Sequence, residues 1–107
     1  MQGTAKGDLA AELERTARLC EDAAGVYVAR HGDHVGTDVV SGLLLAAAAL
    51  DTAVDAVESE AALLITATLA RDAVDAAERR GLDEALLGCV TALRRVTALC
   101  EDACIDG

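Results

Sequence analysis

The chain has 107 residues and a net charge of −10, and it is 53% hydrophobic although it contains no Phe, Trp or Pro. These features predict one domain over 1–107, with a core of Leu, Val and Ala and with helix throughout. The acidic surface repels nucleic-acid phosphates and anionic membranes, so we expect neither as a partner. No apolar leader follows the first residues, and no apolar run reaches the roughly 18 residues of a membrane span, so we expect a cytoplasmic protein.

The first half of the chain predicts two amphipathic helices, because its hydrophobic residues recur about every 3.6 positions. The first helix is expected over 8–31, with an inward stripe that passes through Cys20 and Tyr27 to His31. A left-handed Gly32 would end this helix. The second helix is expected over 37–58, with Thr37 as its N-cap.

The second half predicts helices over 60–80 and 83–105, separated by Gly81. No Gly or Pro divides the second helix from the third, so one continuous helix about 66 Å long is an alternative. The charged faces of the two segments are out of phase, which favours a break capped by Ser59. At the start of the fourth helix, Leu82 and Leu87 are spaced for a hydrophobic staple.

Four helices of similar length with short connections predict an all-α fold, an antiparallel up-down four-helix bundle. The short connections also allow a second arrangement, in which two long hairpins from two chains dimerise into one bundle.

All four cysteines are predicted to face the interior. On a projection at about 100° per residue, Cys89, Cys100 and Cys104 fall within one sector of the fourth helix, and Cys20 lies on the inward stripe of the first. Thiolates are soft ligands that select Cu(I) and other thiophilic ions. Cys100 and Cys104, one helical turn apart, are the expected ligand pair, with Cys20 and Cys89 secondary. Buried cysteine is also a common small apolar core residue, and none of the four requires another role.

The heights of the cysteines along the bundle argue against one shared site. At 1.5 Å per residue, Cys20, Cys89, Cys100 and Cys104 are expected about 18, 25, 9 and 3 Å above the start of the first helix. A zinc site needs four ligands within about 2.3 Å of one ion, so we do not expect a site built from all four cysteines.

The sequence carries no recognisable catalytic motif, and we do not expect an enzyme. It has no E-x-x-H pair for a di-iron site, no G-x-S-x-G and no phosphate-binding loop. His31 and His34 flank the first connection, where we expect them to be solvated or to cap a helix. A peripheral metal contact at this end of the bundle is the alternative.

The segment GCVTALRRVTALCEDAC (88–104) resembles a helix of the bacterial copper storage proteins, as does RLCEDAAGVYVARHG (18–32) followed by the second helix. The resemblance implies a four-helix bundle whose inward cysteines bind Cu(I). Alanine or valine stands at several inward positions where that family often carries a thiol, so this chain cannot store copper in bulk. The resemblance instead implies one or two ions at Cys100 and Cys104.

Two functions therefore remain open from the sequence. The first is binding of Cu(I) or another thiophilic metal through inward cysteines. The second is a non-catalytic module for a protein partner or a homodimer, since Leu63 and Leu64 cannot both face the core and a contiguous exposed apolar patch marks association.

Overall fold

The computed structural model describes the backbone of residues 2–32, 34 and 36–106, and the side chains of residues 8–32, 34 and 36–104. Within this part of the chain there are four helices and no strands: α1 (Gln2–His31), α2 (Thr37–Val54), α3 (Glu60–Arg80) and α4 (Glu84–Asp106). The predicted all-α fold is confirmed, and α2 and α3 are separate helices rather than one continuous helix.

Two predicted boundaries were wrong, by six residues at the start of α1 and by four residues at the end of α2. α1 begins at Gln2 instead of Asp8, because an established helix extends readily where no proline stops it. α2 ends at Val54 instead of Glu58, because the chain tightens into i→i+3 hydrogen bonds, from the N–H of Ala56 to the carbonyl of Ala53 and from the N–H of Ser59 to the carbonyl of Ala56.

The helix ends confirm some of the predicted caps and correct others. Ser59 caps α3, since its hydroxyl accepts a hydrogen bond of 3.2 Å from the N–H of Ala62. Thr37 does not cap α2, because Gly36 takes that position in a left-handed conformation with φ of 67°. A Cβ atom at Gly36 would lie 2.4 Å from the Tyr27 hydroxyl, so this glycine lets the connection pass over the ring.

The leucine staple predicted at the start of α4 stays a prediction. Leu82 and Leu87 are 39% and 54% exposed, and neither belongs to the buried core. Asp83 caps α4, with its carboxylate accepting a hydrogen bond of 3.1 Å from the N–H of Leu86, and this cap places Leu82 and Leu87 at the two staple positions.

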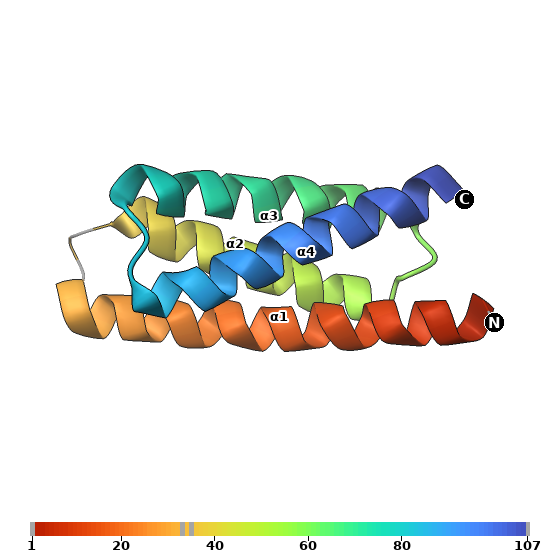
Figure 1. The fold of residues 1–107 in the computed structure, drawn as a ribbon, viewed down its shortest axis with the longest axis horizontal. Helices are drawn as coiled ribbons and strands as arrows, with labels where there is room; N and C mark the ends of the chain where they lie inside the picture. The colour runs from red at the N-terminus through yellow and green to blue at the C-terminus, as the bar shows by residue number, and fades with distance from the viewer. Residues whose placement is uncertain (1, 33, 35, 107) are drawn as a thin grey trace.

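The helices pack in a ring, in the order α1, α2, α3, α4 and back to α1 (Figure 1). Among the described residues, the diagonal pairs α1–α3 and α2–α4 do not approach within 8 Å between Cα atoms. α1 begins and α4 ends at the same end of an elongated body of 44 × 19 × 18 Å. One chain thus closes its own bundle, and a dimer of hairpins is not needed to form it.

The core is made of small and medium-sized side chains. Leu13, Leu43, Leu50, Leu86 and Leu93 are fully buried, and alanines fill much of the space between the helices. Small residues allow close approach, and a Cβ atom at Gly42 of α2 would lie only 3.3 Å from the Cα atom of Ala73 in α3. Cys20, Cys89 and Cys100 belong to this core, and Cys104 packs at its edge.

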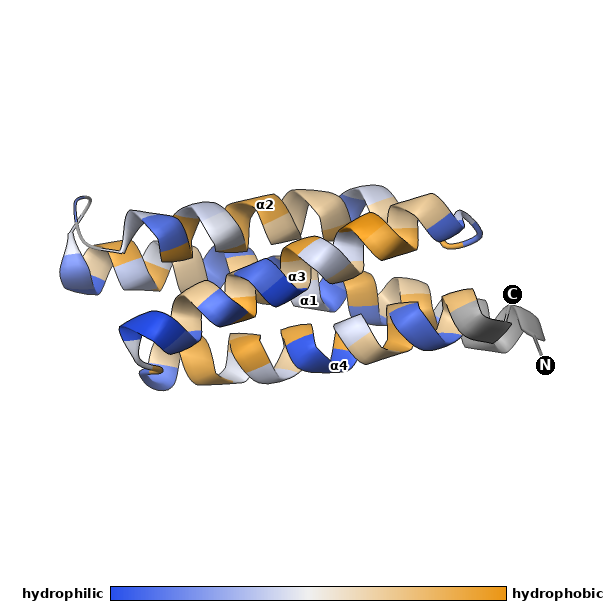
Figure 2. Ribbon diagram, turned by 90° about the horizontal axis from the view of Figure 1, so that it is seen from above, coloured by the Kyte–Doolittle hydropathy of each residue, from blue (hydrophilic) through white to orange (hydrophobic). Residues whose placement is uncertain are grey.

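α2 is the most apolar helix, as its colouring in Figure 2 shows. By length and composition alone, its 18 residues from Thr37 to Val54 would suffice to cross a membrane, and a third of them are buried in the bundle. The core helix of a soluble bundle meets the same criterion. The absence of a membrane partner stays a prediction.

Candidate functional site: a buried thiol pair between α1 and α4

The four cysteines do not meet in one place. All four are free thiols; Cys20, Cys89 and Cys100 are buried, and Cys104 is partly exposed. Among the described residues there is no group of three or more His, Cys, Asp or Glu side chains that could hold a metal ion. Any metal bound by these thiols would therefore have at most two protein ligands from this set.

The structure brings together Cys20 of α1 and Cys89 of α4, whose Sγ atoms lie 3.5 Å apart and form a hydrogen bond. The predicted heights placed these two thiols about 7 Å apart along the axis. That prediction assumed that α4 begins level with His31. Asp83, which caps α4, does contact His31, but the two sulfurs lie closer together than heights along straight, parallel helices predict.

The shared hydrogen bond makes the two thiols chemically unequal. It is the main cause that raises the pKa of Cys20 above its ordinary value, with burial acting in the same direction. The same hydrogen bond lowers the pKa of Cys89, against a weaker opposing effect of burial. In the neutral pair the Cys89 thiol donates to Cys20 Sγ, and loss of one proton leaves a thiolate that the remaining thiol stabilises.

Thr16 adds a polar group to the same buried stripe of α1, one helical turn before Cys20. Its side chain is fully buried, and among the described residues it holds the one buried side-chain oxygen without a hydrogen-bond partner. An unsatisfied buried hydroxyl is costly and calls for an explanation. Its position on the stripe was visible in the sequence, but its lack of a partner could be seen only in the packed bundle.

A groove of about 280 Å³ between α1 and α4 reaches this site. Cys89 lines it, together with Ala23, Val26, Ala85 and Gly88 among others, whereas Cys20 does not. Cys89 is 3% exposed and Cys20 is completely buried. Small molecules therefore meet Cys89 first.

Cys100 and Cys104, the predicted ligand pair, lie elsewhere. Cys100 is eleven residues beyond Cys89, about 16 Å along α4. The Cys104 thiol makes a weak hydrogen bond of 3.8 Å to the carbonyl oxygen of Glu60 on α3. Burial raises the pKa of Cys100 to about 11, with smaller contributions from Cys104 and Glu101. Burial also raises the pKa of Cys104, as do nearby Glu60 and Glu101. Burial thus favours the protonated form of both thiols, and a bound metal would have to displace these protons, as it would the proton of Cys20.

The histidines lie at the opposite end of the bundle from Cys104, and both are exposed. His31 was predicted to continue the inward stripe of the first helix, but its side chain is exposed. Its Nε2 atom lies 3.3 Å from the carboxylate of Asp83, and its ring packs on Tyr27 with centroids 4.5 Å apart. His31 thus contacts the residue that caps α4, and its exposure agrees with the solvated position that was the other expectation from the sequence.

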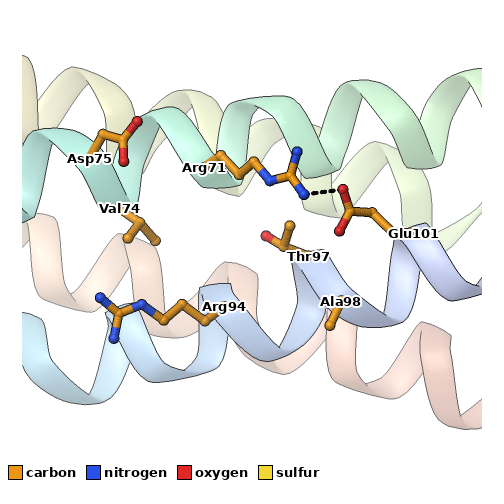
Figure 3. Close-up of a pocket in the computed structure, with 7 residues that line it drawn as sticks. All are labelled: Arg71, Val74, Asp75, Arg94, Thr97, Ala98 and Glu101. Atoms are coloured by element: carbon orange, nitrogen blue, oxygen red, sulfur yellow. Dashed lines mark hydrogen bonds and ion pairs between the residues drawn. The ribbon is translucent and has the colours of Figure 1, made fainter.

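A second pocket, of about 400 Å³, lies between α3 and α4 (Figure 3). Two arginines line it, but each is already paired, Arg71 with Glu101 and Arg94 with Glu78. With its cations neutralised, this pocket offers little to an anion. No sequence pattern indicates this pocket, because it depends on the register between α3 and α4.

Comparison with known proteins adds no function to this geometry. No protein-family model, no curated protein and no solved structure matches the chain. The resemblance to copper storage proteins therefore rests on the sequence segments quoted above.

Proposed function

We propose that the protein binds a single Cu(I) ion, or another thiophilic monovalent ion, between the thiolates of Cys20 and Cys89. The observation that carries this proposal is the 3.5 Å separation of the two Sγ atoms across the α1–α4 interface. The pair differs from the Cys100 and Cys104 pair favoured by the sequence, and it belongs to the same set of four predicted ligands.

A set of two thiolate ligands suits Cu(I) better than zinc. Soft thiolates select Cu(I), which is stable with two sulfur ligands, whereas structural zinc requires four ligands. With metal–sulfur bonds of about 2.3 Å, as in zinc thiolates, a linear S–metal–S unit spans about 4.6 Å. The two sulfurs would separate by about 1 Å from their metal-free positions, a change that side-chain rotation can supply.

The surroundings of the pair fit a bound ion in two further respects. Two thiolates with one Cu(I) carry a net negative charge, which is costly in an apolar core unless a donor faces it. We assign this role to the unpartnered hydroxyl of Thr16, which lies one helical turn before Cys20 on the same buried stripe. The hydrogen bond between the two sulfurs also stabilises the thiolate that forms when the first of the two protons leaves.

The test is an anaerobic titration of reduced protein with Cu(I) against a chromophoric chelator. The wild type and Cys100→Ala/Cys104→Ala should each retain one tightly bound ion, and Cys20→Ala/Cys89→Ala should lose it. Circular dichroism would establish that both double variants remain folded. Equal affinity in wild type and Cys20→Ala/Cys89→Ala would end the proposal.

A second candidate, self-association, is favoured by apolar side chains on the outside of α2 and α3. As predicted, Leu63 is buried and Leu64 is 49% exposed; Ile65 and Leu45 are 58% and 57% exposed. We propose this as an alternative in which the cysteines are structural. A dimer in solution that persists after Leu45→Lys/Ile65→Lys would contradict it, as would a strict monomer.

A further inference from the structure

We propose that Cys89 is an oxidation site for hydroperoxides, and that Cys20 resolves the oxidised sulfur into a disulfide that joins α1 to α4. This inference uses the same thiol pair as the proposed copper site but requires no metal. It rests on the separation of the two sulfurs and on the unequal access to them.

The first observation is proximity across two helices. The Sγ atoms lie 3.5 Å apart, and a disulfide requires about 2.05 Å. Closing the bond therefore needs a movement of about 1.5 Å, similar in size to the movement that copper would require in the opposite direction. Cys100 lies about 16 Å further along α4 and cannot compete for the same partner.

The second observation is the asymmetry of access. The α1–α4 groove is lined by Cys89 and not by Cys20, and Gly88 leaves its wall open, since nothing lies within 4 Å of the place where a Cβ atom would stand. A small hydroperoxide entering the groove meets the sulfur of Cys89. Cys20, fully buried behind it, is placed to attack that sulfur.

The chemistry balances in two steps. The thiolate of Cys89 attacks one oxygen of the peroxide; an S–O bond forms, the O–O bond breaks, and the leaving hydroxide or alkoxide takes up a proton. Cys20 Sγ then attacks Cys89 Sγ; the S–S bond forms, the S–O bond breaks, and hydroxide leaves with the proton of Cys20 as water. The two thiols lose two electrons and the peroxide gains them.

The experiment treats the reduced, metal-free full chain with hydrogen peroxide and follows intact mass and disulfide mapping. We expect the loss of two hydrogen atoms and a single bridge between Cys20 and Cys89. A bridge that involves Cys100 or Cys104 instead, or no bridge, would overturn the proposal. Since no copper is present, a bridge that forms in a protein without Cu(I) affinity would reject only the copper site.

Two sets of variants test the order of events and the route. Cys20→Ala should accumulate a sulfenic acid at Cys89 that dimedone traps, and Cys89→Ala should leave Cys20 unlabelled; labelling of Cys20 alone would reverse the assignment. Gly88→Leu should slow oxidation several-fold by filling the groove. Gly25→Leu, the same change at an open helical position outside the groove, should leave the rate unchanged. Equal rates in both variants would refute the groove as the route.

Discussion

Replacing Thr16 by valine should stabilise the metal-free protein, which is unusual for a change in a core. The Thr16 hydroxyl is fully buried and lacks a partner among the described residues, and leaving such a group unsatisfied costs about 1–3 kcal/mol. Valine has nearly the same shape and a similar helix propensity. Thr16→Val should therefore raise the free energy of unfolding by about 1–3 kcal/mol, measured by urea denaturation under reducing conditions.

Thr66 offers a matched control at a position that is equally buried but satisfied. Its hydroxyl donates to the carbonyl of Ala62 at 2.8 Å and lies 3.3 Å from the carbonyl of Ala49 on α2. Thr66→Val should lower stability by about 1 kcal/mol. If both variants lose stability, the Thr16 hydroxyl is satisfied in solution and the reasoning fails. Because we assign this hydroxyl to the bound thiolates, Thr16→Val should also weaken Cu(I) binding by about tenfold, the effect of one hydrogen bond to a charged group.

Three further predictions concern the cross-link, the close helix contact and the buried thiol of α4. Oxidation that joins Cys20 to Cys89, 69 positions apart, should raise the unfolding free energy by about 4 kcal/mol in urea; an unchanged midpoint would refute it. Gly42→Ala places a Cβ atom 3.3 Å from the α3 backbone. The overpacking cost of about 1–3 kcal/mol should exceed the gain in helix propensity of about 1 kcal/mol, so the melting temperature should fall. Gly25→Ala, where the Cβ atom enters open space, should raise the melting temperature. Since the pKa of Cys100 rises from 9.0 to about 11 on folding, the folded state holds more protons above pH 9. Stability should therefore be constant below about pH 9 and fall by up to about 2–3 kcal/mol by pH 11. Cys100→Ala should remove this part of the loss, and an identical pH profile in the variant would contradict the assignment.

Much of the fold could be predicted from the sequence because hydrophobic residues recur regularly about every 3.6 positions and because typical capping residues stand at several helix ends. Gly32 and Gly81 have positive φ values of 84° and 90° at the ends of α1 and α3. Ser59 caps α3 where the charged faces change phase. The cap of α2 could not be predicted, because Gly36 is selected by a tertiary contact with Tyr27 and not by local preference.

The candidate site was harder to predict than the fold. Helical projection correctly turned Cys20, Cys89 and Cys100 inward. Pairing them required the axial register of α1 against α4, and the predicted heights put about 7 Å along the axis between two sulfurs that lie 3.5 Å apart. Cys100 and Cys104 were the predicted ligand pair because spacing within one helix can be read directly from a sequence. Contacts between helices depend on connections and crossing angles, which local patterns do not fix.

The central claim is that Cys20 and Cys89 act together as a two-sulfur ligand pair. X-ray absorption at the copper edge, on protein loaded anaerobically with one equivalent of Cu(I), tests this claim most directly. We predict two sulfur ligands and no others, with the signal retained in Cys100→Ala/Cys104→Ala and lost in Cys20→Ala/Cys89→Ala. Three or more sulfur ligands, or an unchanged spectrum in Cys20→Ala/Cys89→Ala, would contradict it.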